Sequence, residues 1–397
     1  MKNVQDKIKY LAGEYFHDLV MIRNHLHAHP ELSGQEHQTA GFIAARLAEY
    51  GIPYREGIGG TGLVGLIHGQ GPGTRVIALR ADMDALPVEE RNEVPYKSVN
   101  PGVMHACGHD VHMTSLLGAA RILSQVTDEF GGTVKLIFQP SEESYPGGAK
   151  MMIRDGVLRD PSPVAIFGQH VYPELDAGKA GMRSGKYMAS TDEVFLTIKG
   201  KGGHAAIPDK VVDPVLIAAH IIVALQQIVS RNASPVMPTV LSFGGIRAKG
   251  RTNVIPDEVN VEGIIRTFDE EWRAEVKERI RKMAAALAEG MGGSCDVFID
   301  EGYPYLVNDE NLTRKAWAYA VEYLGKENVV DLDMRMTAED FAYFAQQVPG
   351  CFYRLGTRNE SRGIVSNLHT ATFDVDERSL EIGAGLMAYL AFKELMS

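Results

Sequence analysis

The sequence contains little cysteine and no tract of basic charge. The three cysteines, Cys107, Cys295 and Cys351, are odd in number and too sparse for a disulfide framework, so we expect a reducing compartment, the cytoplasm. Lysine and arginine number 40 against 51 aspartates and glutamates, which gives a net charge of −11. Because nucleic acids and anionic membranes attract clustered positive charge, neither is an expected partner.

Long hydrophobic runs, internal repeats and low-complexity segments are also lacking. No run predicts a membrane-spanning helix, and the apolar residues near the N-terminus recur at helical spacing between charges, unlike the core of a signal peptide. A chain of 397 residues exceeds one ordinary domain core, so we expect two domains. These features are typical of a globular enzyme.

What the sequence does contain is a stretch, residues 104–112, with three imidazoles, one thiol and one carboxylate. Cys107 and His109 are two positions apart, so on an extended segment their side chains leave the same face and could bind one metal ion or a close pair. The weaker candidates in this stretch are His105, Asp110 and His112. A buried or reactive cysteine among unrelated histidines is the alternative, because a short cluster still lacks its remaining ligands.

The pattern of apolar residues predicts strands that alternate with helices through the first half of the chain. The expected strands are 63–68, 75–79, 133–138 and 164–167, and the expected helices are 35–50, 112–126 and 147–156. A glycine-rich, hairpin-like turn separates the first two strands, and the histidines at 25, 27 and 29 are predicted to form a loop. Such alternation indicates a largely parallel sheet covered by helices.

Polar residues follow these strands at their carboxyl ends. Asp82 follows one strand, Glu142 and Glu143 follow a second, and His170 follows a third. Open α/β sheets build their sites at this edge. We therefore expect these side chains to converge with the Cys107 cluster.

The predicted order changes to β-α-β-β-α-β between residues 193 and 300, which is the ferredoxin-like pattern. Afterwards helices and strands of the first kind resume and carry His369 toward the sheet edge. The expected architecture is an α/β catalytic domain, with a mixed, mostly parallel sheet flanked by helices, interrupted by a small α+β domain. We expect residues 1–188 and 302–397 to form the catalytic domain and residues 189–301 to form the inserted domain.

Five side chains from separate parts of the chain could bind metal. They are Cys107, His109, Glu143, His170 and His369. Thiolate, imidazole and carboxylate ligands suit zinc and other first-row divalent ions. Five ligands exceed one tetrahedral site and would suit two ions that share a bridging group. A purely structural zinc at Cys107 is the alternative, and it would leave the ion no open position.

Glu142 is the candidate general base. On an extended backbone, adjacent side chains point to opposite sides, so Glu143 could bind metal while Glu142 takes a proton from water. A glutamate pair after a strand is otherwise a solvated loop. Asp82 is predicted to orient a ligand imidazole, and a plain turn residue is the alternative.

These residues lie in sequence blocks that resemble a known family. The blocks are HAHPELS (27–33), LRADMDALP (79–87), MHACGHDVH (104–112), FQPSEE (138–143), GGHAA (202–206), TNVIP (252–256), AEDF (338–341) and LHT (368–370). Together they span essentially the whole chain. They resemble the metal-dependent aminoacylase and carboxypeptidase family of amidohydrolases, most closely its branch of N-acyl-amino-acid amidohydrolases, hippurate hydrolases and plant auxin-conjugate hydrolases. Many relatives carry a ligand histidine where Arg80 stands, and the Cys107 cluster would replace it.

The resemblance implies a two-metal catalytic domain with an inserted lid and dimerisation domain. It implies the five ligands named above, with Glu142 as general acid and base. It also implies that His204 stabilises the oxyanion, usually in the partner subunit's site, and that Asn253 and Arg266 hold the substrate's free carboxylate. The alternatives are a polar turn residue for His204 and a surface charge for Arg266.

We therefore predict a cytoplasmic, homodimeric, metal-dependent hydrolase that removes the acyl group from an N-acyl amino acid or related conjugate. Two divalent ions per subunit are expected, zinc first, with manganese, nickel or cobalt also compatible. A dipeptidase or carboxypeptidase acting on short peptides, and a non-catalytic metal-stabilised binding protein, are the alternatives. Glu339 and Asp340 stay unassigned, because they could cap a helix expected over 338–347.

Overall fold

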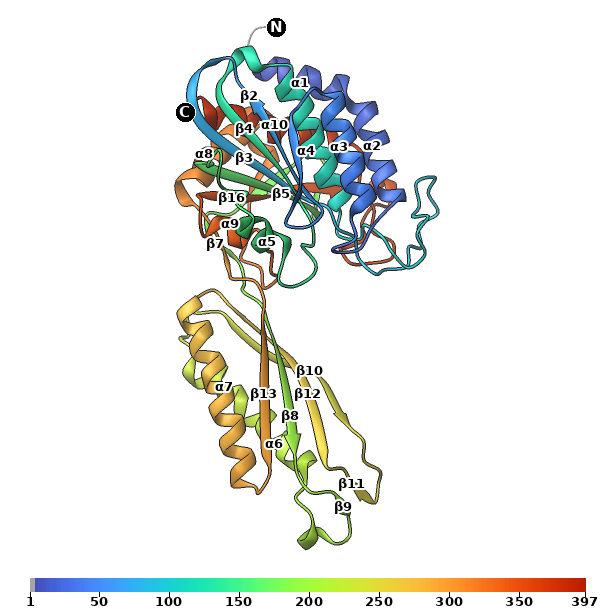
Figure 1. The fold of residues 1–397 in the computed structure, drawn as a ribbon, viewed down its shortest axis with the longest axis vertical. Coiled ribbons are helices and arrows are strands. Elements are labelled where there is room, and N and C mark those ends of the chain that lie inside the picture. The colour runs from blue at the N-terminus through green and yellow to red at the C-terminus, as the bar shows by residue number, and fades with distance from the viewer. Residues whose placement is uncertain (1–3) are drawn as a thin grey trace. The chain divides into compact units, whose positions relative to one another are not determined.

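The computed structural model describes residues 4–397, which form two compact units. The first unit comprises residues 4–187, 307–333 and 340–397. The second comprises residues 188–306 and 334–339, and it is termed the inserted unit because the chain leaves the first unit to form it and then returns. Figure 1 labels most elements of both units.

The first unit is built on an eight-stranded sheet of order β1-β2-β4-β3-β5-β16-β6-β15. Its strands are β1 (Tyr54–Ile58), β2 (Gly62–His68), β3 (Gly71–Asp82), β4 (Gly131–Gln139), β5 (Ala165–Asp176), β6 (Ala180–Met182), β15 (Val329–Asp331) and β16 (Gly350–Arg358). Strand β3 runs parallel to β4 and β5, and β5 runs parallel to β16. The mixed, mostly parallel sheet predicted from the sequence is confirmed, and the buried second half of β3 is typical of a strand covered on both faces.

The expected hairpin between the first two strands is wrong. Both runs form strands, but β4 lies between them and pairs antiparallel with β2 and parallel with β3. The glycine-rich turn passes over the start of β4, where the amide of Gly69 donates to the carbonyl of Gly132. Turn composition predicts a reversal of the chain, but it does not predict which strand enters between the two arms.

Helices cover this sheet, and the most buried of them carries His109. They are α1 (Val4–Glu14), α2 (Phe16–Ala28), α3 (His37–Glu49), α4 (His109–Ser124), α5 (Gly148–Arg154), α8 (Glu310–Leu324), α9 (Ala342–Ala345) and α10 (Arg378–Leu395). Helix α4 packs against β3 and is itself covered by α2 and α10 (Figure 1). Three expectations need correction: α4 begins earlier than predicted, only α9 is helical between 338 and 347, and His25 and His27 end a helix rather than form a loop.

The inserted unit has the predicted ferredoxin-like order. Its elements are β8 (Asp192–Lys199), β9 (Gly203–His204), α6 (Pro214–Gln227), a π-helical turn (Ile228–Asn232), β10 (Thr239–Ala248), β11 (Val254–Ile255), β12 (Glu258–Thr267), α7 (Glu270–Gly290) and β13 (Ser294–Glu301). The main sheet has the order β10-β12-β8-β13, and α6 and α7 cover one of its faces (Figure 1). Short strands β7 (Gly185–Met188) and β14 (Leu306–Asn308) lie where the chain passes between the units.

The expectation that no segment is long and apolar enough to cross a membrane needs correction at helix α6. With its π-helical turn it spans Pro214–Asn232 and is long and apolar enough to do so by length and composition. Core helices pass the same test, and α6 buries Ile217, Ile221 and Leu225 against the sheet of the inserted unit. Its outer face is unusual, because Val223 there is 74% exposed.

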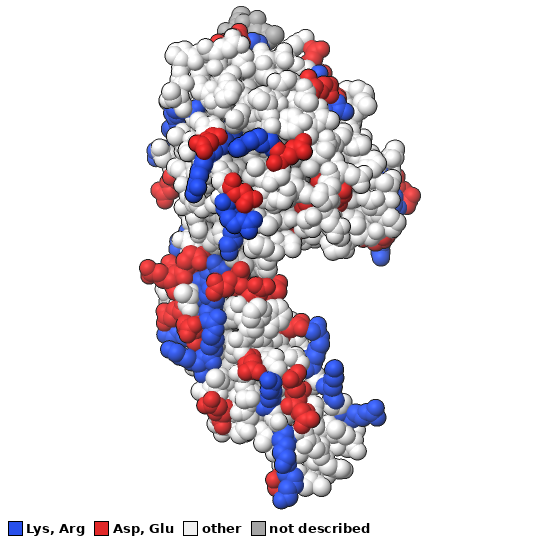
Figure 2. All heavy atoms as spheres, viewed as in Figure 1, with Lys and Arg blue, Asp and Glu red and all other residues white. Residues whose placement is uncertain are grey.

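Helix α7 instead carries ion pairs such as Arg279 with Glu275. Figure 2 shows acidic and basic side chains interspersed on the viewed face.

Candidate active site

Cys107 and His109 flank a left-handed turn at Gly108. Gly108 has φ = 79°, and a Cβ atom there would lie 2.5 Å from a methyl carbon of Val171, so glycine is required. His109 is the first residue of α4. The spacing of Cys107 and His109 predicted an extended segment, and this expectation is wrong. The glycine turn and the helix start bring them together instead.

The structure brings the five predicted metal ligands together in two groups that share Cys107. Cys107, His109 and His170 form one group and Cys107, Glu143 and His369 form the other, with the potential ligand atoms of each group within 4.8 Å of one another. The Cys107 Sγ lies 3.5 Å from Nε2 of His170 and 3.4 Å from Nε2 of His369. Two groups with one common donor suit two ions that share a ligand.

His170 lies inside β5 rather than after its end. The strand continues beyond its pairing with β3 because it remains paired with β16. Nδ1 of His170 lies 2.8 Å from the carbonyl oxygen of Val171, which can only accept, so Nδ1 carries the proton. The lone pair of Nε2 is then available on the side of Cys107.

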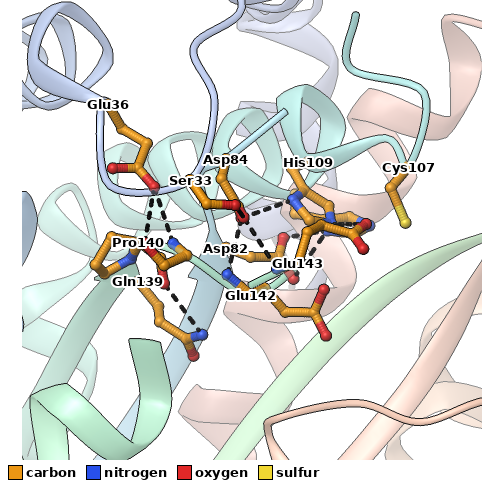
Figure 3. A network of polar contacts seen from close by, with 12 residues as sticks. Ser33, Glu36, Asp82, Asp84, Cys107, His109, Gln139, Pro140, Glu142 and Glu143 are labelled. Atoms are coloured by element: carbon orange, nitrogen blue, oxygen red, sulfur yellow. Dashed lines mark hydrogen bonds and ion pairs between the residues drawn. The ribbon is translucent and has the colours of Figure 1, made fainter. Parts of the chain in front are cut away.

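Glu142 and Glu143 lie in a turn after β4, not on the extended backbone expected for them. Ser141, which precedes them, has φ = 52°, a left-handed conformation that is uncommon for residues other than glycine. Figure 3 shows the two side chains leaving this turn in different directions. Oε1 of Glu143 lies 3.9 Å from Nε2 of His109, whereas Oε1 of Glu142 accepts a hydrogen bond from the amide of Asp340.

Asp82 does not orient a predicted ligand, contrary to expectation. Its Oδ1 lies 2.5 Å from Nδ1 of His112 and its Oδ2 lies 2.6 Å from Nη1 of Arg80, whereas Nε2 of His109 is 3.8 Å away. The amide of Val171 donates to Nε2 of His112, so Nδ1 must carry the proton that binds Asp82. Both ring nitrogens of His112 are thus engaged, and His112 supports the strand that carries the predicted ligand His170.

Asp84 occupies the position beside His109 that Asp82 was expected to hold. Its Oδ1 lies 3.3 Å from Nδ1 of His109, and its two oxygens accept hydrogen bonds from the amides of Glu142 and Glu143. Sequence reasoning missed this residue. The only signal was a second aspartate two positions after Asp82, and spacing alone could not show which carboxylate reaches the imidazole.

Arg80 and Asp340 form a buried ion pair at the same sheet edge. Nη2 of Arg80 donates to Oδ1 of Asp340 at 2.9 Å, and Nε2 of Gln139 donates to both oxygens of that carboxylate at 2.8 Å. The amide of Ala149 also donates to it. The capping alternative for Asp340 is therefore wrong, because its side chain is committed to these partners.

Asp110, in the first turn of α4, belongs to a buried cluster of charged side chains that the sequence did not predict. Oδ2 of Asp110 accepts from Nε of Arg23 at 2.9 Å and lies 2.7 Å from Nδ1 of His27, and these three side chains are 0% exposed. Arg23 also contacts Asp374, and His27 contacts Glu90. The cluster fixes the first turn of α4, which carries His109.

The pKa shifts in the site follow burial and negative charge. Burial and the carboxylates of Glu143 and Glu142 raise the pKa of the Cys107 thiol. Burial lowers the pKa of His109, but the charges of Asp82 and neighbouring carboxylates outweigh it and raise the pKa to about 10. The site therefore concentrates negative charge around an imidazole and a thiol.

The residues present fit a divalent metal site. Nε2 of His109 and Oε1 of Glu143 are buried and lack a hydrogen-bond partner among residues 4–397. Buried polar atoms are rarely left unsatisfied, and a cation between these atoms would satisfy both. It would also offset the charge of the surrounding carboxylates. His105, by contrast, stands apart from these ligand groups.

The predicted lid residues all belong to the inserted unit. His204 is exposed in β9, and its Nδ1 accepts a hydrogen bond from the amide of Ala206. Asn253 is exposed and adjoins β11, whose Val254 pairs with His204. Arg266 pairs with β10 near the end of β12, about 25 Å along the strand from the end near β11. The structure therefore brings His204 and Asn253 together and places Arg266 apart from them.

An α/β sheet whose edge carries potential Cys, His and Glu ligands beside a second glutamate is typical of a metal-dependent hydrolase. The chain belongs to peptidase family M20/M25/M40, whose family model matches residues 78–393. This confirms the predicted family and the assignment of the chain as a metal-dependent amidohydrolase or peptidase of that family.

Individual relatives extend over nearly the whole chain. Thermostable carboxypeptidase 2 of Saccharolobus solfataricus is 39% identical and aligns with 98% of both chains. N-acetyl-L-cysteine deacetylase of Bacillus subtilis is 40% identical, covering 95% of this chain and 88% of its own. A crystal structure of a dinuclear metal-binding M20 peptidase from Bacillus subtilis has a TM-score of 0.83 and 35% identity, covering 97% of this chain and 99% of its own. That likeness and the two ligand groups support a site for two divalent ions.

Proposed function

We propose that this enzyme hydrolyses the amide bond of N-acyl amino acids or related conjugates. The observation that carries the proposal is the pair of ligand groups joined at Cys107, with Glu142 beside His109 and Glu143. A relative that is 40% identical is an N-acetyl-L-cysteine deacetylase. This supports an acyl-amino-acid substrate over a longer peptide.

Cys107, His109, Glu143, His170 and His369 would hold the two ions. Cys107 belongs to both ligand groups, and it would therefore be the shared ligand. Bound divalent ions supply Lewis acidity, which lowers the pKa of water and polarises the scissile carbonyl. The thiolate favours zinc among the compatible ions, and metal availability in the cell also contributes to the choice.

Glu142 performs the proton transfers. Glu142 is 7% exposed, and its Oε1 accepts a hydrogen bond from the amide of Asp340 at 3.4 Å. Glu142 takes a proton from the attacking water and delivers it to the nitrogen of the leaving amino acid. A positioned general base of this kind typically accelerates a reaction by about 10²–10⁴-fold.

His204 stabilises the oxygen of the tetrahedral intermediate. The amide of Ala206 donates to Nδ1 of His204, so the neutral ring carries its proton on Nε2 and presents a hydrogen-bond donor to its exposed side. A donor aimed at a developing oxyanion is worth about 3 kcal/mol of transition-state stabilisation. This supports the oxyanion role over that of a polar turn residue.

We propose that the active enzyme is a homodimer formed through the inserted unit. If Asn253 and Arg266 both bind the substrate carboxylate, they must come from different copies, because the length of β12 separates them in one chain. The outer face of α6 offers an apolar surface for a second copy, with Leu216 52% and Val223 74% exposed. His220, Gln226 and Gln227 are exposed on the same helix, so the surface proposed for the second copy is apolar with polar side chains around it.

The cytoplasm is the proposed location. Cys107, Cys295 and Cys351 are free thiols in the structure, and a thiol ligand at the site is preserved in a reducing compartment.

Substitution of the base tests the mechanism. Glu142→Gln keeps the shape of the side chain but cannot take a proton, so we expect metal content equal to that of the wild type and a fall in kcat of at least about 100-fold. Metal analysis and steady-state kinetics measure the two quantities. Near-normal turnover by this variant would rule out Glu142 as the base.

The substrate class is tested by parallel assays of the wild-type enzyme with N-acetyl and N-acyl amino acids and with short peptides, including peptides with a free carboxyl end. We expect the acyl amino acids to have the higher kcat/KM. A preference for peptides would instead support a carboxypeptidase, the activity named for a relative that is 39% identical. Absence of hydrolysis across the panel after metal loading would support a binding protein.

A further inference from the structure

Two buried carboxylates accept hydrogen bonds from three consecutive amides of the turn after β4 (Figure 3). The amide of Ser141 donates to Oε1 of Glu36 at 2.9 Å. The amides of Glu142 and Glu143 donate to the two oxygens of Asp84 at 3.0 and 2.9 Å. Glu36 is 0% and Asp84 is 1% exposed, so water does not compete for these bonds. Each amide of the turn has a fixed acceptor, which fixes the backbone that carries both glutamates.

The conformation of the turn requires such support. The left-handed backbone of Ser141 is unfavourable for a residue with a side chain and persists only where neighbouring interactions hold it. Glu36 supplies that support, and it is itself fixed by hydrogen bonds from the amide of Gly34 and the hydroxyl of Thr61. On the other side, a Cβ atom on Gly148 would lie 1.6 Å from the carbonyl oxygen of Pro140. The backbone before the turn therefore packs directly against Gly148, with no room for a side chain there.

Asp84 also connects this turn to the start of α4. The same carboxylate that binds the amides of Glu142 and Glu143 lies 3.3 Å from Nδ1 of His109 and accepts a hydrogen bond from the hydroxyl of Ser33 at 2.6 Å. A partner at Nδ1 orients the imidazole and leaves Nε2 for a metal. Asp84 thus contacts the ring of His109 and the backbone amides of Glu142 and Glu143, which are two predicted metal ligands and the proposed base.

We propose that Asp84 and Glu36 are positioning residues of the Glu142–Glu143 turn and that only Asp84 acts on metal binding. Asp84 aligns Glu143 and His109 for metal binding and also holds the amide of Glu142. Glu36 holds the left-handed Ser141, which directs Glu142 for proton transfer. The inference rests on the proposed roles of Glu142, Glu143 and His109. It also gives the HAHPELS block (27–33) a role, because Ser33 at its end donates a hydrogen bond to Asp84.

Cobalt binding without substrate tests the role of Asp84. Metal-free Asp84→Asn is titrated with Co²⁺, and the visible absorption of the bound ion is recorded. The amide can no longer accept both backbone N–H bonds, so we expect affinity to fall by about 10–100-fold, the usual effect of losing a partner of a metal ligand, and the spectrum to change. Asp376→Asn makes the same substitution at a residue that is also 0% exposed in the first unit, and it should leave affinity and spectrum unchanged.

Glu36→Ala removes both carboxylate oxygens and tests whether Glu36 acts on proton transfer alone. We expect it to lower kcat with little change in KM, Co²⁺ affinity or spectrum, because Glu36 accepts its hydrogen bonds from Gly34, Thr61 and Ser141 rather than from a predicted metal ligand. A folded Asp84→Asn protein with wild-type Co²⁺ affinity and spectrum would overturn the proposal, as would equal loss of Co²⁺ affinity in Glu36→Ala.

If Asp84→Asn does not fold, Ser33→Ala replaces it. This variant removes one hydrogen bond to Asp84, so we expect a smaller loss of Co²⁺ affinity that Ser33→Thr restores, and unchanged affinity in Ser33→Ala overturns the proposal. The Co²⁺ titrations use no substrate, so they remain decisive if the wild type hydrolyses no N-acyl amino acid, a result that would refute the proposed substrate alone. A wild type that binds no Co²⁺ would overturn both proposals.

Discussion

At the scale of single residues, the first turn of α4 depends on buried charges. Asp110 follows His109 directly, and its carboxylate contacts Arg23 and His27 while all three side chains are excluded from water. A buried charge that keeps its partners is tolerated, but removal of one partner leaves the others uncompensated. The structural support of the site is therefore also a determinant of the stability of the fold.

We expect Asp110→Asn to lower the free energy of unfolding at pH 7 by about 3–5 kcal/mol, because Arg23 and His27 then lose the fully buried carboxylate that they share. Burial opposes ionisation of Asp110, but Arg23 and His27 outweigh it and hold its pKa below the ordinary 3.8. The stabilisation by Asp110 is thus present above pH 3.8 and is lost as the pH falls below it, so the difference in unfolding free energy between wild type and variant should narrow below about pH 4. Denaturant unfolding of the metal-free proteins at several pH values measures this difference.

Asp374→Asn is the comparison for this prediction. Asp374 contacts the same Arg23, but its side chain is 17% exposed, so water can replace part of the contact and the loss should be smaller. Equal losses in the two variants, or a difference that does not change with pH, would contradict the assigned role of Asp110.

At the scale of elements, the two helices of the inserted unit have different outer faces. Helix α7 exposes ion-paired side chains, including Arg281 with Glu278, as expected of a solvated helix. Helix α6 exposes Val215, Leu216 and Val223. The same sheet supports both helices, so the contrast makes the outer face of α6 the surface on which the proposed homodimer is tested.

We expect Val223→Glu to shift the protein from dimer to monomer, because a charge in an apolar interface is desolvated without compensation. Sedimentation velocity measures the assembly state, and metal content should be unchanged. Ala286→Glu, at an exposed position of α7, is the matched control and should remain dimeric. A dimeric Val223→Glu protein would place the interface elsewhere, and binding of the wild type to lipid vesicles would identify a membrane as the occupant.

At the scale of the whole molecule, the active site joins distant parts of the first unit. Cys107 precedes α4, Glu143 follows β4, His170 lies in β5, and His369 lies between β16 and α10. Ions that bind these groups connect segments separated by up to 262 positions. Metal binding is therefore expected to stabilise the folded first unit as well as to support catalysis.

We expect chelation to lower the thermal unfolding temperature and reloading to restore it. At a free metal concentration 100-fold above Kd, a single site adds about 2.7 kcal/mol to the free energy of unfolding. Differential scanning calorimetry across a metal titration measures the effect, and the order of response among zinc, manganese, nickel and cobalt ranks their affinities. Glu142→Gln should respond like the wild type, whereas His369→Ala should respond less. An unfolding temperature that is independent of metal would refute the ligand assignment.

The sequence by itself determined the alternation of strands and helices, the ferredoxin-like insertion and the set of chemically competent side chains. These follow from local periodicity and from residue type, which act over a few positions. It also indicated that Asp82, Glu142 and His170 gather at one sheet edge, since the carboxyl ends of parallel strands meet there.

Only the tertiary structure decided which groups contact one another. It placed β4 between β2 and β3, assigned Asp82 to His112 and Asp84 to His109, and replaced the extended backbone around Gly108 by a left-handed turn. Carboxylates two residues apart are equivalent in a sequence pattern. They become different only when neighbouring elements supply specific donors at hydrogen-bonding distance, and those donors come from positions far along the chain.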